Sequence, residues 1–343
     1  MLMNLVTPRR RRPSALTQRT AIGLVCALVL MACSGGSDTE PLPLPTSEVT
    51  PVARATAGEH VALGDSFSSG EGSGTYSDRC HRSNFAYTDQ VEREFSFVGE
   101  THNATCSGAR TRNVLEEGQH GEPPQIDAVT ETTSLVTIGI GGNDANWTDV
   151  VFNCWREDTE GCRSDDADVR DRMEGAADDT LAVYRAAKER AAHDARIIGL
   201  GYPRLFPREP SDPQYEIGGC IPFLGCLEAK LSTGEQTYLN DLVGDFNDLL
   251  EQRAEEAGIE FVPLTDAFDG HEIGTDTSFF NGFRLGWEGC GFPTSWDDIL
   301  DCVKALVSAE TFHPTAAGQQ RIGGKLVEQI NHPESPATEE AGG

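Results

Sequence analysis

Short apolar runs alternate with longer amphipathic stretches along most of the chain. Each run has about the length of a strand and nearly continuous apolar residues, as in "LVTIGI" at residues 135–140. Strands that are apolar on both sides are typical of a parallel sheet covered by helices on both faces. We therefore predict strands at residues 60–64, 135–140, 196–201 and 259–264, and a weaker one at residues 95–98.

The segments between these runs carry apolar residues at helical spacing. Residues 237–257, for example, place Leu239, Leu242 and Phe246 on one stripe of a helix. The alternation of strands and helices predicts an α/β fold of three layers, α/β/α, with a central, mostly parallel five-stranded sheet and right-handed crossovers. Further helices are predicted at residues 166–195 and 315–330.

Two polar residues follow directly after predicted strands. Ser66 lies just beyond the first strand, in "HVALGDSFSSGEGSG", and Asn143 lies just beyond the strand "LVTIGI". Parallel strands end at a common edge of the sheet, and ligands bind outside those carboxyl ends. The sequence therefore predicts that Ser66 and Asn143 open onto the same edge.

The N-terminal residues are typical of an export signal. Basic residues precede the apolar run "AIGLVCALVLMA", which is short for a membrane span and ends in Leu30-Met31-Ala32-Cys33. That ending resembles a bacterial lipobox, so we expect residues 1–33 to be a signal peptide and Cys33 to be lipidated. Cleavage by an ordinary signal peptidase and an uncleaved membrane anchor are the alternatives.

Composition divides the remainder of the chain into three parts. Residues 34–58 are rich in Pro, Ser, Thr and Gly, which predicts a disordered linker, and residues 332–343 predict a disordered tail. Residues 59–331 are long enough to form one large α/β domain with its own core.

The charge of the chain excludes some partners. There are 27 basic and 55 acidic residues, a net charge of −28, and removal of residues 1–33 deletes five arginines and no acid. Such a surface repels nucleic acid and anionic lipid head groups. We expect no nucleic-acid partner, membrane contact only through the N-terminal lipid anchor, and a monomer.

The cysteines agree with export. Two of the ten lie in the leader, and an even set remains, which in an exported chain predicts four disulfides. Eight cysteines allow 105 pairings, of which we expect the nearest-neighbour one. No CxxC pair or histidine cluster indicates a metal, so no metal site is expected. The eight cysteines are Cys80, Cys106, Cys154, Cys162, Cys220, Cys226, Cys290 and Cys302.

Four segments together carry the parts of a serine nucleophile. A serine needs a base to take its proton and fixed donors to hold the oxyanion. Ser66 follows a strand, Gly108 lies in a tight bend of "TCSGARTRNV", Asn143 follows two glycines, and His313 precedes a proline in "ETFHPTAAGQ". Each fragment alone is usually a turn or a surface residue. Their occurrence in this order, two of them after predicted strands, indicates a serine hydrolase.

On these segments the chain resembles the SGNH (GDSL-type) hydrolase family, in the branch of secreted actinobacterial lipases and esterases. The likeness runs from Val61 to about Gly323 through "GDSFSSGEG", "CSGART", "IGGND" and "HPTAAGQ". It implies Ser66 as nucleophile and His313 as general base. It also implies an oxyanion hole made by the backbone N–H groups of Ser66 and Gly108 and the Asn143 amide.

The resemblance adds a third catalytic residue and two disulfides. The family usually has aspartate three residues before the histidine, where this chain has Glu310. Glu310 can accept from the imidazole Nδ1–H and set the tautomer. Some relatives use a backbone carbonyl instead, which would leave Glu310 a bystander. The spacing of disulfides in this branch suits Cys80–Cys106 and Cys154–Cys162.

Other polar residues near these motifs receive structural interpretations. Asp65 and Asp144 are interpreted as caps that brace neighbouring backbone. Two interpretations are open for Glu71: it lines the entrance of the site or, as we prefer, it belongs to a solvated face. No partner is visible for His81.

These observations predict an extracellular or cell-envelope carboxylic-ester hydrolase, a lipase or esterase, that forms an acyl-enzyme at Ser66 and needs no cofactor. A small-molecule acyl ester or lipid is the expected substrate. One alternative is an O-deacetylase of polysaccharide or peptidoglycan that uses the same residues. The other is a non-catalytic, tethered binding lipoprotein.

Overall fold

The computed structural model describes residues 49–156, 159–210, 215–221, 225–283 and 308–333. The expected signal peptide, including Cys33, most of the expected linker and nearly all of the expected tail lie outside the described residues. Cys290 and Cys302 lie outside them as well.

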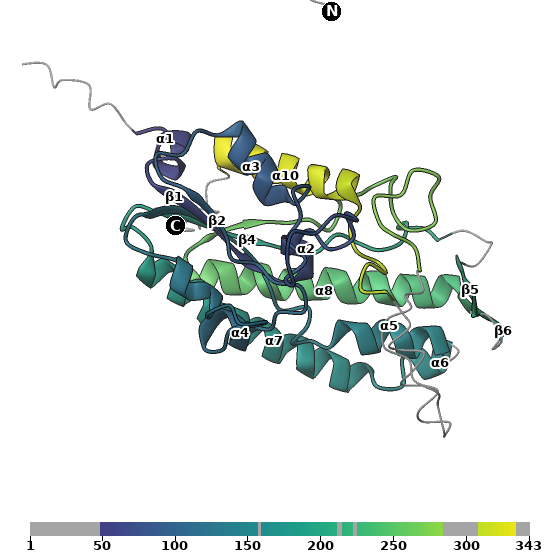
Figure 1. Cartoon of the computed structure of the whole chain (residues 1–343). Helices are drawn as coiled ribbons and strands as arrows, with labels where there is room; N and C mark the ends of the chain where they lie inside the picture. The colour runs from purple at the N-terminus through teal and green to yellow at the C-terminus, as the bar shows by residue number, and fades with distance from the viewer. Residues whose placement is uncertain (1–48, 157–158, 211–214, 222–224, 284–307, 334–343) are drawn as a thin grey trace, which may run out of the picture. The chain divides into compact units, whose positions relative to one another are not determined.

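A five-stranded parallel sheet forms the centre of the described part of the chain (Figure 1). Its strand order is β2-β1-β3-β4-β7. The chain adds β2 on one side of β1 and then crosses to the other side of β1 to add β3, β4 and β7. The parallel sheet and four of the five predicted strand positions are confirmed. The strands are β1 (Glu59–Gly64), β2 (Thr101–Asn103), β3 (Thr133–Gly139), β4 (Arg196–Leu200) and β7 (Glu260–Val262).

The fifth strand differs from the prediction. The edge strand is β2, and residues 95–98 form a loop instead. Phe95 in that loop is buried, and the ring of Phe97 stacks on the ring of His60 with centroids 5.4 Å apart. The apolar residues therefore cover the sheet from a loop. Strand β2 has the polar sequence "THN". It lies at the edge of the sheet and pairs with β1 alone, so its residues do not have to be apolar on both faces.

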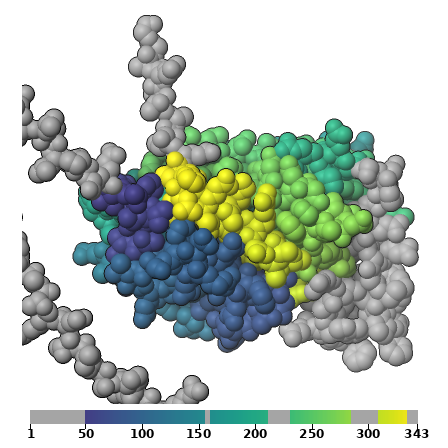
Figure 2. Space-filling model, turned by 90° about the horizontal axis from the view of Figure 1, so that it is seen from above, coloured from purple at the N-terminus to yellow at the C-terminus, as the bar shows by residue number. Residues whose placement is uncertain are grey.

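Helices cover both faces of the sheet. Figure 1 places α1, α3 and α10 on one face and α4, α7 and α8 on the other, and Figure 2 shows α1, α3 and α10 side by side. The predicted three-layer α/β/α fold is thus confirmed. These helices are α1 (Pro51–Ala55), α3 (Tyr87–Glu94), α4 (Thr111–Leu115), α7 (Asp166–Arg190), α8 (Thr233–Ala257) and α10 (Ala316–Asn331).

The folded part begins before residue 59, which corrects the predicted linker boundary. Helix α1 starts after Thr50, whose side chain caps it by accepting from the N–H of Ala53 at 3.2 Å. Proline at the first helical position favours the same start. Ala55 is fully buried in the core, so composition alone misassigned this apolar turn to the linker.

Strand β3 shows how the core is divided between the two faces. All seven of its residues are buried. Leu135 packs into one apolar cluster, and its neighbours Val136 and Ile138 pack into the other. Successive side chains of a strand point to opposite faces, so a strand that is apolar throughout requires a helical layer on each side.

Six further elements complete the part of the chain that the structure describes. The antiparallel pair β5–β6, in which Cys220 and Cys226 are register partners, was not predicted from the sequence. Within the described ranges, no helix has the length and apolarity to cross a membrane. These elements are α2 (Ser66–Ser69), the 3-10 helix η1 (Gln125–Ala128), α5 (Trp147–Arg156), α6 (Thr159–Cys162), β5 (Tyr215–Ile221) and β6 (Gly225–Leu231).

Two of the expected disulfides are present. Cys80 is bonded to Cys106 and Cys154 to Cys162, as the resemblance implied. The pairing of Cys220 with Cys226 stays a prediction.

Candidate active site

The candidate site lies at the switch point of the sheet. Gly64 at the end of β1 is the register partner of Gly139 at the end of β3. Ser66 and Asn143 follow these adjacent strands and line one cavity, as predicted. A switch point between neighbouring parallel strands is where doubly wound sheets bind ligands.

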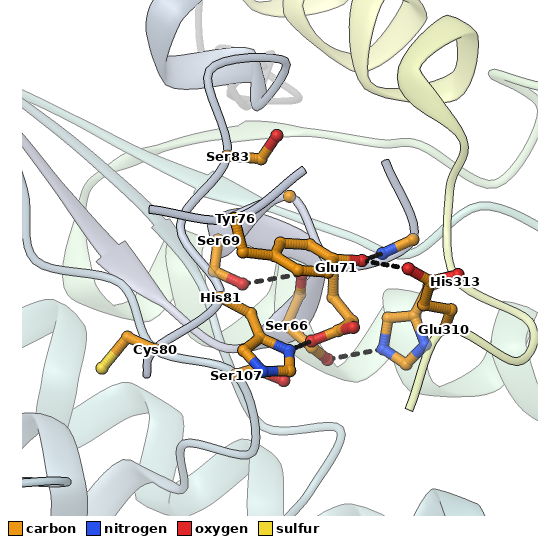
Figure 3. Close-up of polar contacts among 12 residues, drawn as sticks. Ser66, Ser69, Glu71, Tyr76, Cys80, His81, Ser83, Ser107, Glu310 and His313 are labelled. Carbon is orange, nitrogen blue, oxygen red and sulfur yellow. Dashed lines mark hydrogen bonds and ion pairs between the residues drawn. The ribbon is translucent and has the colours of Figure 1, made fainter. Parts of the chain in front are cut away.

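Ser66 and His313 meet across this edge (Figure 3). The Ser66 Oγ lies 2.7 Å from the His313 Nε2, and Ser66 is 8% exposed. Ser66 is the first residue of α2, and His313 precedes α10, which Thr315 caps. The two residues come from distant segments, so the tertiary fold brings them together.

The Thr311 carbonyl takes the place that was expected of the Glu310 carboxylate. Nδ1 of His313 lies 3.0 Å from this carbonyl oxygen, while Oε1 of Glu310 accepts from the Tyr76 hydroxyl at 2.7 Å. A carbonyl can only accept, so Nδ1 carries the hydrogen and Nε2 is left to accept from Ser66. Phe312 has a positive φ of 59°, and this left-handed residue turns the chain so that the Thr311 carbonyl faces the ring.

Two opposing influences act on the His313 imidazole. Burial lowers the pKa of His313, because removal from water disfavours the charged form. The negative charge of Glu71 acts in the opposite direction, and so do the Thr311 hydrogen bond and the charge of Glu310. A lowered pKa leaves the imidazole neutral near neutral pH, as a general base requires.

The three expected oxyanion donors border the same cavity. Gly108 has a φ of +76°, a conformation that glycine adopts without strain. Among the described residues, no hydrogen-bond acceptor is recorded for the backbone N–H of Ser66 or of Gly108. One N–H of the Asn143 amide donates to the Ala109 carbonyl at 2.9 Å, which orients the group and leaves its second N–H for another acceptor. Three donors are thereby held in position before a ligand arrives.

Asp65 and Asp144 brace backbone, as expected. Asp65 caps α2 by accepting from the Phe67 N–H at 3.0 Å, and it accepts from the Tyr202 hydroxyl at 2.6 Å. Burial raises the pKa of Asp65 to about 7. Asp144 accepts from the N–H and, at 2.8 Å, the hydroxyl of Thr111, which ties the segment after β3 to the start of α4.

A cluster of polar side chains beside the site was not predicted from the sequence. Glu71, interpreted as solvated, is fully buried, and its Oε2 lies 2.5 Å from Nδ1 of His81. The Tyr76 ring stacks on the His81 ring at 4.6 Å and reaches Glu310 through its hydroxyl (Figure 3). Glu71 and His81 are ten residues apart, without the spacing of a helix or strand pair, so no local pattern pointed to the contact.

An apolar cavity of about 320 Å³ opens beside Ser66 and His313. Trp147 lines it. A second hollow of about 90 Å³ reaches from Ser66 toward Tyr202 and Phe246. In the described part of the chain, no group of three or more His, Cys, Asp or Glu residues is placed to hold a metal. Apolar side chains of the larger cavity are Phe67, Trp147, Val151, Phe152, Leu205, Phe283, Ala309 and Phe312.

Known proteins resemble the chain over most of its length. It is 32% identical to Lipase 1 of Streptomyces coelicolor over 281 residues, which are 79% of this chain and 85% of that protein. It is 33% identical to a lipase of Streptomyces rimosus over 247 residues, 71% of this chain and 83% of that protein.

Two solved Streptomyces structures have a fold similar to that of this chain. The crystal structure of phospholipase A1 from Streptomyces albidoflavus NA297 superimposes with a TM-score of 0.60 at 28% identity. The extracellular lipase from Streptomyces rimosus superimposes with a TM-score of 0.59, also at 28% identity. Each match covers 79% of this chain and 99% of the other chain.

A family model described as "GDSL-like Lipase/Acylhydrolase family" matches residues 62–321, which include all four segments of the candidate site. The chain is therefore a carboxylic-ester hydrolase that belongs to the GDSL-like lipase/acylhydrolase family.

Proposed function

We propose that the chain hydrolyses acyl esters through an acyl-enzyme on Ser66, with His313 as general base. The observation that carries the proposal is the contact of 2.7 Å between Ser66 Oγ and His313 Nε2. The Thr311 carbonyl supports it by fixing the hydrogen on Nδ1. In this assignment the carbonyl, and not Glu310, orients the imidazole.

The chemistry follows from these positions. The Ser66 oxygen attacks the ester carbonyl carbon while its proton passes to Nε2 of His313. The N–H groups of Ser66, Gly108 and Asn143 hold the oxyanion of the tetrahedral intermediate. When that intermediate collapses, His313 gives the proton to the leaving alcohol. Water then repeats the sequence on the acyl-enzyme, which frees the acid and restores Ser66.

The substrate that fits best is an ester of a fatty acid. The cavity beside Ser66 encloses about 320 Å³ and is bordered largely by apolar and aromatic side chains. An acetyl group would leave most of that space unfilled, which argues against the deacetylase alternative. The likeness to proteins called lipase and phospholipase A1 supports the same substrate class.

The protein is proposed to act outside the cell on the membrane surface. Two disulfides and the likeness to an extracellular lipase support export. Lipidation of Cys33 would then tether a monomeric enzyme by the linker. Labelling with an alkyne fatty acid tests the anchor: Cys33→Ser should abolish both label and membrane association, and a labelled variant would contradict it.

The decisive experiment combines covalent labelling with a chain-length series. A fluorophosphonate probe should label the wild-type protein and fail to label Ser66→Ala. Release of p-nitrophenol should rise from acetyl to longer acyl esters. Activity that survives in Ser66→Ala would refute the mechanism, and a preference for acetyl would favour the deacetylase. A wild-type protein that the probe does not label would favour the non-catalytic alternative.

A further inference from the structure

Glu71 is a buried carboxylate that the proposed mechanism does not use. It is 0% exposed, its Oε2 lies 2.5 Å from His81, and among the described residues its Oε1 has no hydrogen-bond partner. Burial of an ionised group costs several kcal/mol unless other interactions compensate. Glutamine would fill nearly the same volume without that cost, so packing alone does not account for the acid.

Backbone contacts hold Glu71 next to both reacting residues. Its N–H donates to the Ser66 carbonyl at 3.0 Å. Gly72, the next residue, has a φ of +91°, and a methyl group there would lie 2.8 Å from the His313 Cβ. The Asn281 amide donates to the Gly72 carbonyl at 2.6 Å and to the His313 carbonyl at 3.2 Å. Figure 3 shows the Glu71 side chain between His81 and the Ser66–His313 pair.

The partner of Glu71 is held in an unfavourable backbone conformation. His81 has a φ of +53°, which costs a residue other than glycine about 1–3 kcal/mol. The adjacent Cys80 is bonded to Cys106, and the Tyr76 ring covers the imidazole at 4.6 Å. The Tyr76 hydroxyl accepts from the Gly72 N–H at 3.0 Å. Several independent contacts therefore keep a basic side chain on the carboxylate.

A charge at this position acts on the reaction through His313. As Ser66 loses its proton, His313 becomes an imidazolium inside the protein. The Thr311 carbonyl offers this cation a dipole, whereas the aspartate of a triad offers a full negative charge. Among the influences that raise the pKa of His313 against burial, the charge of Glu71 is the largest, ahead of the Thr311 hydrogen bond and Glu310.

We propose that Glu71 is a positioning residue that supplies the negative charge stabilising the His313 imidazolium, and that His81 holds its carboxylate in place. No proton passes to Glu71: the Ser66 proton moves to Nε2 and from there to the leaving alcohol. The inference rests on the proposed function, since it concerns the proton transfer between Ser66 and His313.

The test compares Glu71→Gln with Glu235→Gln. Glu235 is also buried, but it belongs to the capping box of α8, which glutamine can also form, and it lines neither cavity. In Glu71→Gln the NMR titration of the His313 imidazole should move to lower pH, and so should the acid limb of kcat/KM. The kcat should fall by about tenfold with little change in KM, because the lost interaction forms in the transition state. Glu310→Gln should produce a smaller shift, and Glu235→Gln none.

An unchanged His313 titration in a folded Glu71→Gln variant would overturn the proposal. If that variant does not fold, Glu71→Met with His81→Leu removes both partners and leaves no buried charge unpaired. The double variant should show the same shift of His313 to lower pH, and its absence would again overturn the inference. Failure of the proposed function would appear separately, as a wild-type protein that the fluorophosphonate probe does not label.

Discussion

Asp65 and Glu71 are buried carboxylates on either side of Ser66 in the sequence, and their partners differ. Asp65 accepts from the Tyr202 hydroxyl and the Phe67 N–H, which are both neutral donors. Glu71 faces the basic imidazole of His81. Burial raises the pKa of Asp65 to about 7, so its surroundings favour the protonated form. The partner of a buried acid, and not its burial, therefore distinguishes a carboxylate that braces backbone from one that supplies charge.

The largest effect is expected from His313, the residue through which the charge of Glu71 would act. His313→Gln keeps a hydrogen-bonding side chain but cannot take the Ser66 proton. The kcat/KM should fall by about 10⁴- to 10⁶-fold, measured with a p-nitrophenyl ester. The thermal midpoint serves as the control for folding. Activity within about a hundredfold of wild type would mean that Asp65 or Glu71 accepts the proton itself, and the contrast between them would need another basis.

Asn143→Ala removes a neutral hydrogen-bond donor. Its effect therefore distinguishes the loss of oxyanion binding from the loss of a charge near His313. One lost oxyanion-hole donor lowers kcat by about 10²- to 10³-fold. Because the amide carries no charge, the acid limb of the pH–rate profile should stay where it is in the wild type. Glu71→Gln should show the reverse pattern, a smaller loss of rate with a displaced limb. A displaced limb in Asn143→Ala would remove this distinction.

The sequence predicted the elements that carry a repeating pattern. Strand β3 is apolar throughout, and Ser66 and Asn143 follow strands, so their common edge could be inferred. Strand β2 was missed because an edge strand of three polar residues carries no such pattern. Helix α1 was missed because its short apolar turn lies next to Pro- and Ser-rich chain.

The parts of the site that were missed depend on tertiary contacts. The Thr311 carbonyl belongs to the backbone, which every residue has, so no residue type in the sequence indicates its contact with His313. The contact between Glu71 and His81 lies beside two tertiary features, the loop at Gly72 that approaches His313 and the disulfide of Cys80. Neither determinant can be read from the two residues themselves.

Loss of the Cys80–Cys106 disulfide should further distinguish the roles of the carboxylates of Asp65 and Glu71. Its sequence separation is 26, against 8 for Cys154–Cys162, so replacement with serine should cost about 3.5 kcal/mol for the first pair and about 2.5 kcal/mol for the second. Urea unfolding measures both. Cys80 adjoins His81, so the first variant should also displace the acid limb of activity toward lower pH. An undisplaced limb would show that the disulfide does not help to hold Glu71.

The smallest effect on rate is expected from Asp65→Asn. Asparagine is as good a helix cap as aspartate and can accept from the Tyr202 hydroxyl, so kcat/KM should change by less than about threefold. Stability should respond to pH instead. Between about pH 4 and 7 the unfolded chain has released the Asp65 proton while the folded protein retains it, so rising pH favours unfolding of the wild type.

The advantage of Asp65→Asn in the free energy of unfolding should therefore grow from about pH 4 to about pH 7, as measured by urea unfolding at several pH values. His60 acts in the opposite direction, because burial lowers its pKa to about 3, but it is present in both proteins and cancels in the difference. A difference that does not vary with pH would mean that Asp65 is ionised in the folded protein throughout. Asp65 would then be a second source of charge beside Ser66, and the partners of the two carboxylates would no longer distinguish them.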